Sequence, residues 1–534
     1  MTQSARRSTR GFRQIWMFPR NIRKITPLNT GLILRALIAA SERGSSWVGE
    51  QGNQDLFAKL LDDYGIKKGG ELRDAGSGGS RTYEAQMRAL GLIYKADDGA
   101  LKLTQAGEDL ASLRNIAETL QYQMMRFQFP APYSQGPMVN LDPSIKIRPF
   151  LFLLQLAGDP ELNGLSTKDI AVPVVWGRNH ASFNQCKELI LKGREHGLES
   201  VITPNDPIWT SRTTGNSFEE RMVDILDISN TFKCALEGTG LIQIRYIGDE
   251  KRFFPAPSMG GAIAKMAIPP FIDFENLPLF QASLQYGTRI GAVKDTRRIF
   301  MPKANPEMLT KSAAILRRFT STIRLPVYQQ EVDQFIEEMK RDFGASRNLV
   351  LEAIEPIIQD PEAYIGSSLI DLSKGGAKTA EEFEKTVCHL FDREFGFVAD
   401  WTGRKPRPGM VGGYMDVFVV ETGRNKCGII DTKSTDSYEL PHDDVAKALS
   451  TYIDSAGELY GSSSNLELSF VAYISHLISP GAEGRAKRIY DDKNVPVSLI
   501  SAYGLNSMRN DNRYIKNPEA VTNRLSMNPV SLII

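Results

Sequence analysis

The sequence predicts a multidomain α+β protein in which N-terminal winged-helix-type domains precede a C-terminal α/β domain. Three observations support this fold class. The chain of 534 residues is long for one hydrophobic core, a helix followed by a hairpin is indicated twice in its N-terminal half, and an amphipathic helix followed by two strands begins near residue 379. We expect a winged-helix domain in residues 1–125, a second region with such a module in 126–300, a helical linker in 301–375 and the α/β domain in 376–534.

Composition excludes several classes of protein. No apolar stretch approaches the length of about 20 residues that spans a bilayer, so we expect a cytoplasmic protein without membrane contact. The four cysteines occur singly, without a CxxC pair, which argues against a zinc cluster and against a disulfide framework. Since the net charge is only +1, any affinity for DNA must come from local basic patches.

The clearest basic patch is the N-terminal arm. Seven basic residues occur in the first 24 positions, no acidic residue precedes Glu42, and the arm is either a solvated extension or a segment that contacts DNA phosphates. Because Trp16 and Phe18 interleave with the basic residues, we expect part of the arm to be docked. The basic residues are Arg6, Arg7, Arg10, Arg13, Arg20, Arg23 and Lys24, of which Arg13, Arg20 and Arg23 are our DNA-binding candidates.

The first helix-and-hairpin pattern comprises a helix in residues 82–92, strands in 92–95 and 100–103, and a further helix. Tyr83, Met87 and Leu90 recur at helical spacing and predict a buried face. Arg81 and Arg88 then look outward and are candidates to contact DNA. The turn at 97–99 is acidic, which makes the helix the expected contact, although winged helices also serve as dimerisation or packing modules.

The second pattern comprises a helix in residues 218–236 and strands in 241–247 and 252–254. Before it lies an apolar segment, 147–156, and then Ser166, which resembles the N-cap of a helix that carries Lys168. The polar cluster Arg178, Asn179 and His180 comes next. Arginine and asparagine suit the edges of guanine and adenine, so we take Lys168 and this cluster as DNA-binding candidates, although loops commonly contain such residues. Residues 305–360 are helical and charged, which predicts a bridging segment.

The segment 379–452 carries the candidate chemistry. Phe383, Val387, Leu390 and Phe391 form the apolar stripe of a helix, with Glu384 at its edge. Two strands come after it, 415–421 and 426–433, separated by a turn in 422–425. This pattern predicts a β-hairpin.

The register of this hairpin brings two acids together. If Glu421 pairs with Lys426 across the turn, Asp416 stands directly opposite Asp431, at a Cβ separation of roughly 4.5–5.5 Å. Two such carboxylates would repel each other unless they held a cation, and an all-oxygen site suits Mg²⁺. Because side chains alternate along a strand, Lys433 lies on the face of Asp431 and Thr432 points away.

Two acids, a divalent cation and an ammonium are the equipment of phosphodiester hydrolysis, since the cation polarises the phosphate and the ammonium stabilises developing negative charge. The alternative is that Asp431, Thr432 and Lys433 form an ordinary polar strand end, as such residues do in most proteins. The opposing acid, the apolar strand and the helix with Glu384 favour catalysis.

At these residues the sequence resembles the PD-(D/E)xK nucleases, and in particular FokI-type cleavage domains. The run from Gly428 to Lys433 is similar to the catalytic strand of that domain, and residues 438–441 with the next helix are similar to the segment after that strand. The resemblance covers about residues 379–500 and implies a restriction-endonuclease-like fold. It implies that Asp416 and Asp431 are metal ligands, Lys433 the catalytic lysine and Glu384 a supporting glutamate. Met415 stands where such motifs have proline.

The N-terminal part, at residues 122–130 and 147–170, is similar to the AlwI and nicking-enzyme group of type IIS restriction endonucleases. Those enzymes bind an asymmetric sequence and cut at a fixed distance from it. The resemblance implies double-stranded DNA as partner, Mg²⁺ as cofactor with Ca²⁺ supporting binding without cleavage, attack by water without a covalent intermediate, and a companion DNA methyltransferase in the host. One site of this kind cuts one strand, so a double-strand break implies self-association.

Three other functions fit the same residues. A strand-specific nicking endonuclease has the same chemistry without pairing of its nuclease domains. A structure-specific or repair nuclease differs in having no fixed cutting offset. A winged-helix DNA-binding regulator with an inactive nuclease fold is the non-enzymatic alternative, against which the presence of Asp416, Asp431 and Lys433 argues.

Overall fold

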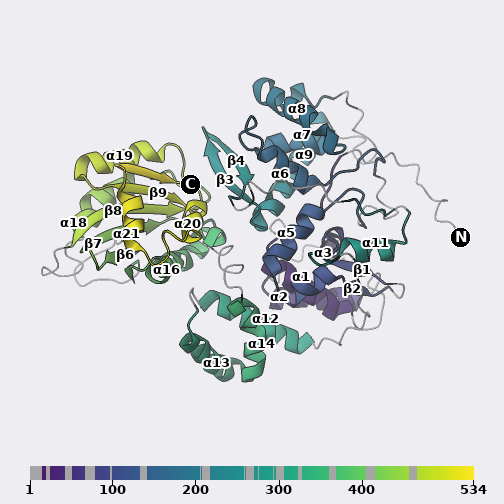
Figure 1. The fold of residues 1–534 in the computed structure, drawn as a ribbon, viewed down its shortest axis with the longest axis horizontal. Helices are drawn as coiled ribbons and strands as arrows, with labels where there is room; N and C mark the ends of the chain where they lie inside the picture. The colour runs from purple at the N-terminus through teal and green to yellow at the C-terminus, as the bar shows by residue number, and fades with distance from the viewer. Residues whose placement is uncertain are drawn as a thin grey trace. The chain divides into compact units, whose positions relative to one another are not determined.

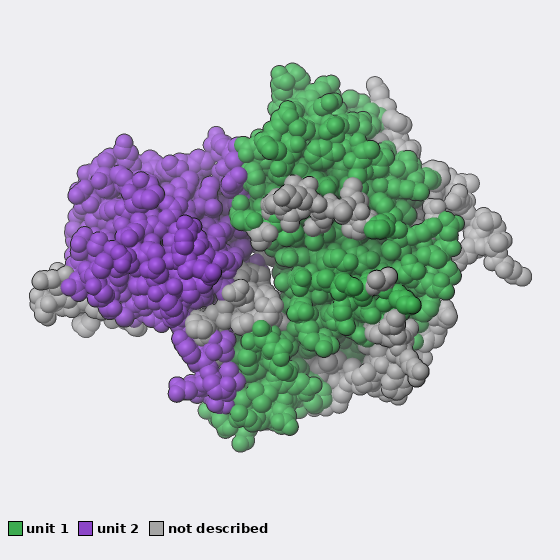
Figure 2. All heavy atoms as spheres, viewed as in Figure 1, with its two compact units in different colours: residues 1–243, 252–319, 335–363 green, residues 244–251, 320–334, 364–534 purple. Residues whose placement is uncertain are grey.

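The chain divides by its internal contacts into two compact units (Figure 2). Unit 1 comprises Met1–Gln243, Arg252–Phe319 and Phe335–Ala363, and unit 2 comprises Ile244–Lys251, Thr320–Gln334 and Tyr364–Ile534. The structure, a computed structural model, describes residues 15–19, 25–41, 51–66, 78–96, 99–132, 141–204, 206, 217–257, 259, 270–274, 276–292, 294–295, 306–322, 327–359, 369–403, 415–455 and 466–534. Within these ranges no helix has the length and apolar character that crossing a membrane requires.

Unit 1 begins with helices and a short hairpin (Figure 1). Tyr83, Met87 and Leu90 are buried, as their spacing predicts. The helix that carries Tyr83 and Met87 ends at Ala89, before Leu90 and residue 92, because Gly91 has a left-handed backbone (φ 69°) that stops the helix. Residues 97 and 98 of the predicted acidic turn lie outside the described ranges. The elements are α1 (Pro27–Ser41), α2 (Gln51–Asp63), α3 (Gly78–Ala89), antiparallel strands β1 (Ile93–Lys95) and β2 (Leu101–Leu103), α4 (Gln105–Ala111) and α5 (Ile116–Arg126).

The remainder of unit 1 confirms the predicted apolar helix and the second helix-and-hairpin pattern. Trp16 and Phe18 are buried, so the described part of the N-terminal arm is docked as expected. Trp16 Nε1 donates to the Gly177 carbonyl (2.7 Å). The Trp16 ring packs edge-on against Phe232, and the Phe18 ring packs against Phe232 at a tilt. The elements are α6 (Pro149–Ala157), α7 (Thr167–Trp176), α8 (Phe183–His196), α9 (Phe218–Gly238), strands β3 (Ile242–Ile247) and β4 (Glu250–Pro255), and α11 (Leu279–Tyr286). Of the β3-β4 hairpin, Ile244–Lys251 is assigned to unit 2.

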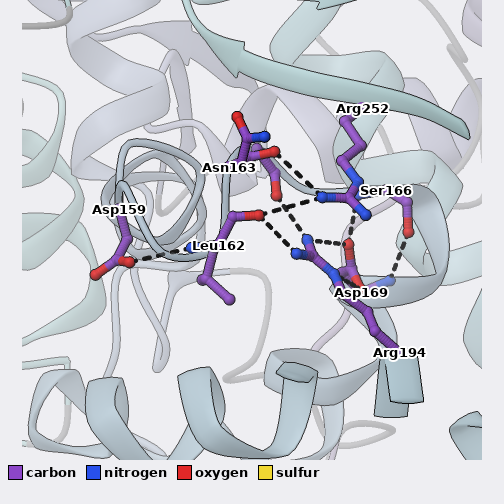
Figure 3. Close-up of polar contacts among 8 residues, drawn as sticks. Asp159, Leu162, Asn163, Ser166, Asp169, Arg194 and Arg252 are labelled. Atoms are coloured by element: carbon purple, nitrogen blue, oxygen red, sulfur yellow. Dashed lines mark hydrogen bonds and ion pairs between the residues drawn. The ribbon is translucent and has the colours of Figure 1, made fainter. Parts of the chain in front are cut away.

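The start of α7 is fixed by a buried polar cluster (Figure 3). Ser166 caps the helix as predicted, in a capping box with Asp169. Arg194 of α8 contacts both oxygens of Asp169 (3.1 and 2.8 Å) and donates to the carbonyls of Leu162 and Gly164. Since Asp169 is 5% exposed, this charge pairing offsets the cost of its burial and joins α8 to the start of α7.

The predicted bridging segment is helical. It contains α12 (Pro306–Thr322), α13 (Gln329–Phe343) and α14 (Arg347–Gln359). Glu331 near the start of α13 belongs to unit 2, where it pairs with Arg393 (2.6 Å), and the Arg393 guanidinium lies over the Tyr328 ring. Hydrogen bonds from Arg393 lower the pKa of Glu331 more than its partial burial raises it.

Unit 2 is built on a six-stranded mixed sheet of order β10-β9-β8-β7-β6-β5. Strands β5, β6 and β7 pair antiparallel, and β7 to β10 run parallel. The strands are β5 (Val398–Trp401), β6 (Val417–Glu421), β7 (Lys426–Thr432), β8 (Glu467–Ser475), β9 (Val497–Ser501) and β10 (Val530–Ile533).

Helices cover both faces of this sheet (Figure 1). On one face Phe383 and Val387 of α16 (Ala380–His389) pack with residues of α20 (Ala502–Arg509) and α21 (Pro518–Ser526) against Ile430. On the other face α17 (His442–Lys447), the π-helix Ala448–Tyr452 and α19 (Ala482–Lys493) pack against Ile429. Because Ile429 and Ile430 belong to opposite cores, the strand is buried on both faces, which explains its apolar sequence.

Candidate active site

The hairpin of β6 and β7 has the register that the sequence predicts. Glu421 pairs with Lys426, and the ladder runs to Val417 opposite Ile430. Asp416 immediately precedes β6, and Asp431 is the next residue of β7 after Ile430. The two acids therefore face each other at the point where the antiparallel ladder ends.

The two carboxyl groups interact directly. Asp431 is 1% exposed, and Asp416 is partly buried. Burial raises the pKa of Asp416 well above its ordinary value, and the charge of Asp431, a hydrogen bond with that side chain and the charge of Glu384 raise it further. The pair thus resists carrying two negative charges in the absence of a cation.

Thr432 differs from its predicted orientation. Strand alternation predicts that it points away from the acids, yet its amide (2.6 Å) and its hydroxyl (3.0 Å) both donate to Asp416 Oδ2. The reason is that Asp416 lies outside the ladder, where its carbonyl accepts from the Thr402 amide and its carboxylate is available to the last residue of β7. These two hydrogen bonds fix the orientation of the Asp416 carboxylate.

Lys433 lies beside Asp431, as strand alternation predicts. Its Nζ is 2.9 Å from the Asp431 carboxylate. Burial lowers the pKa of Lys433, but the charges of Asp431 and Asp416 and the hydrogen bond to Asp431 outweigh burial, so that the pKa is raised overall. The amine is therefore held as an ammonium next to the acid pair.

Glu384 is brought near this group but is engaged elsewhere. Its Oε2 accepts from Trp401 Nε1 (2.9 Å), while its charge still acts on Asp416. Lys385, the next residue of α16, lies over the Trp401 ring at 4.5 Å. The supporting position proposed for Glu384 thus stays a prediction, with Trp401 as the residue that orients its carboxylate.

The donor set suits a hard divalent cation. Two converging carboxylates supply oxygen ligands of the kind that Mg²⁺ prefers, and the pKa of Asp416 is raised first by burial and then by the charge of Asp431. Among the described residues no group of three or more His, Cys, Asp or Glu side chains gathers at one point in the manner of a metal site. Asp416 and Asp431 are the residues that would hold such a cation.

Sequence reasoning missed Asp444 and Tyr438. Asp444 lies in α17, is 7% exposed, and has its Oδ2 3.9 Å from Lys433 Nζ. The Tyr438 hydroxyl donates to the same oxygen (2.8 Å). An acid in the first turn of a helix is already explained by the helix dipole, so its sequence position gave no signal of a second role.

The DNA-binding candidates are dispersed over unit 1. Arg88 pairs with Glu84 one helical turn away (3.6 Å). Both side chains are only partly exposed, so they are less accessible than the predicted outward-looking face implies. Lys168 is exposed near the start of α7. Arg13, Arg20 and Arg23 lie outside the described residues, as does the side chain of Arg81.

The polar cluster at 178–180 is local structure at least in part. Arg178 pairs with Asp142 (3.5 Å), and Asn179 caps the 3-10 helix His180–Ser182 by accepting from the Ala181 amide. His180 packs edge-on to Phe152. Of these side chains Asn179 is exposed, while Arg178 and His180 are half-buried.

The comparisons with known proteins bear on the C-terminal part. A comparison with curated proteins gives no match. Two solved structures of the restriction endonuclease FokI, one of them bound to DNA, align over 97% of this chain and 100% of their own length at 12% identity, with a TM-score of 0.27. That score is too low to establish a shared overall fold. Residues 344–523 match the family model described as FokI, cleavage domain. The C-terminal part of this chain is therefore similar to the cleavage domain of FokI.

Proposed function

We propose that this chain is a type IIS restriction endonuclease that binds a short asymmetric double-stranded DNA sequence and hydrolyses phosphodiester bonds at a fixed distance outside it. The observation that carries the proposal is the meeting of Asp416, Asp431 and Lys433 within the segment that matches the FokI cleavage domain. Division of the chain into two units supports a separation of DNA recognition from cleavage.

Asp416 and Asp431 are the residues that would hold Mg²⁺. When bound, the ion supplies Lewis-acid polarisation of the scissile phosphate. Thr432 keeps the Asp416 carboxylate oriented through its amide and hydroxyl. Lys433 presents an ammonium that stabilises the negative charge that develops on the phosphate during attack by water. We expect Ca²⁺ to support DNA binding without cleavage.

The DNA contacts are proposed on unit 1 and the N-terminal arm. The helix-and-hairpin elements α3-β1-β2 and α9-β3-β4 have the order of winged-helix modules, and we propose them as the sequence-reading parts. Cleavage of both strands then requires two nuclease units, so self-association on DNA is part of the proposal. A companion methyltransferase would protect host DNA.

Two alternatives use the same residues. A nicking enzyme has this site without productive pairing of nuclease units. A DNA-binding regulator with an inactive nuclease fold is disfavoured, because both acids and the lysine are present and in contact. Digestion of supercoiled plasmid separates the three functions. The proposed endonuclease yields linear DNA, a nicking enzyme yields open-circle DNA, and an inactive regulator leaves the plasmid uncut.

The direct test is run-off sequencing of plasmid digested with Mg²⁺. We expect every cut to map at one offset from one short sequence. Asp431→Ala should abolish cleavage, because it removes a metal ligand and the partner of Lys433, while sequence-specific binding in Ca²⁺ persists. Cleavage by this variant at the wild-type rate would show that the site lies elsewhere, and cuts without a common sequence would favour a structure-specific nuclease.

A further inference from the structure

Lys433 lies between two carboxylates rather than beside one. Its Nζ is 2.9 Å from Asp431 and 3.9 Å from Asp444. Asp431 comes from β7 and Asp444 from α17, so the ammonium joins the catalytic strand to the helix after it. The longer contact is an ion pair without a direct hydrogen bond.

Asp444 is itself held firmly. Its Oδ2 accepts from the Tyr438 hydroxyl (2.8 Å), and its Oδ1 accepts from Lys447 Nζ (3.0 Å). Burial raises the pKa of Asp444, but Lys433, Tyr438 and Lys447 together keep it below the ordinary value. Burial and the charge of Asp431 raise the pKa of Tyr438, so its hydroxyl remains a donor. Asp444 is therefore a fixed, ionised carboxylate at neutral pH.

A cation at the acid pair changes the surroundings of Lys433. The Asp431 carboxylate that accepts from the ammonium is also a proposed ligand of the divalent ion, so binding of the ion would compete with this hydrogen bond. A carboxylate outside the acid pair can then keep the ammonium in place. Asp444 has this position, since its own contacts are with Tyr438, Lys447 and Lys433.

We propose that Asp444 is a positioning residue that holds Lys433 at the site while Asp431 serves as a metal ligand. This inference rests on the proposed nuclease function. It assigns Lys433 both partners in the metal-free protein, Asp431 at 2.9 Å and Asp444 at 3.9 Å, and Asp444 as the remaining partner once Asp431 serves as a metal ligand. Asp444 acts through Lys433 and has no contact with the reacting atoms in this assignment.

The first test is steady-state cleavage by Asp444→Asn, which keeps the side-chain volume and an acceptor for Tyr438. We expect kcat to fall about 10- to 100-fold, as for other residues that orient a metal-site group, with KM unchanged because DNA binding is not altered. Asp444→Glu should recover part of kcat, which a purely structural defect would not do. The control is Lys493→Gln, which removes the partner of the exposed Asp454 and should change kcat less than about fivefold.

The second test needs no activity. In metal-free protein, unfolding by urea is measured for Asp444→Asn, Lys433→Met and the double variant. A direct ion pair predicts that the two effects are not additive, whereas additive effects would refute the contact. If wild type cleaves DNA and Asp444→Asn cleaves with the same kcat, the inference is wrong and the proposed function stands. If wild type cleaves no DNA, the proposed function fails and with it the assignment of Asp444 to catalysis.

Discussion

Asp416 lowers the stability of the metal-free fold at neutral pH, in a position that suits a cation. Its carboxyl group is desolvated and lies against Asp431, and its pKa is raised for both reasons. A raised pKa means that the folded state prefers the protonated form, so the stabilisation is present at acidic pH and is lost as pH rises through the raised pKa. At neutral pH the metal-free fold therefore carries an unfavourable charge that a divalent ion would relieve.

We predict that Asp416→Asn raises the thermal unfolding temperature of the metal-free protein at neutral pH. Asparagine is uncharged and can still accept from Thr432, so the variant loses the repulsion and keeps the hydrogen bonds. Adding Ca²⁺ should stabilise wild type and have little effect on the variant. Calorimetry with chelator and with Ca²⁺ measures both, and equal stabilisation of the two proteins by Ca²⁺ would contradict a role for Asp416 as a ligand.

His180 gives a second prediction, on pH. Burial and the charge of Arg148 lower its pKa from 6.5 to about 4, and its Nε2 lies 3.4 Å from the Arg148 amide. A lowered pKa favours the neutral ring in the fold, so its contribution is present above pH 6.5 and is lost as pH falls toward 4. Between pH 7 and pH 5, wild type should lose more stability than His180→Gln.

Urea unfolding at both pH values checks this prediction. The control is His196→Gln, which removes a histidine whose side chain is 56% exposed. A His180→Gln variant with the same pH dependence as wild type would show that His180 is equally basic in the folded and unfolded chain.

At the residue scale, the sequence predicts positions better than contacts. Asp431 and Lys433 share a face because strand side chains alternate, and the structure confirms it. The hydrogen bonds of Asp416 with Thr432 and of Glu384 with Trp401 were not predictable, because both depend on where the ladder ends and on the approach of β5. Asp444 escaped notice because only the packing of α17 against the sheet brings it to Lys433.

At the scale of elements, the position of Asp431 depends on the close packing of β7 with β8. Gly428 pairs with Phe470, at a register shift between Cys427 and Gly428. A Cβ on Gly428 would stand 2.2 Å from the Phe470 ring, which is fully buried. The absent side chain therefore lets β8 approach β7 three residues before Asp431.

We predict that Gly428→Ala lowers the free energy of unfolding by about 1–3 kcal/mol, the usual cost of overpacking a core. Gly423→Ala is the matched control, since no atom lies within 4 Å of a Cβ there, and its effect should stay within about 0.5 kcal/mol. Adding Phe470→Leu to Gly428→Ala should recover part of the loss. Equal denaturation midpoints for the two single variants would mean that Phe470 does not limit the space at Gly428.

Element boundaries were less predictable than element types. The 218–236 helix is observed as Phe218–Gly238, and the 82–92 helix as Gly78–Ala89. Periodicity identified both helices, but their ends depend on local terms such as the left-handed Gly91 and the capping box at Ser217. The π-helical turns at Leu390–Glu394 and Ala448–Tyr452 have no signature in an apolar spacing and were not expected.

At the scale of the whole molecule, the two units favour a separation of DNA recognition from cleavage. This separation has a consequence for how each strand is cut. In the proposed function, the acid pair and Lys433 form one hydrolytic site, which acts on one strand in one polarity. The opposite strand runs in the other direction, so a second copy of unit 2 must supply its site. Mixed pairs of an active and an inactive chain should therefore cut one strand only.

This is tested by digesting supercoiled plasmid with limiting wild type while Asp431→Ala protein is added in increasing excess. We expect linear product to decline and open-circle product to rise, because most pairs then contain one intact acid pair. Albumin at the same concentration serves as the control for crowding and should leave the product ratio unchanged. If linear DNA remains the main product at high excess of the variant, each chain cuts both strands on its own, and self-association is unnecessary. If wild type alone yields only open circles, the nicking alternative is correct.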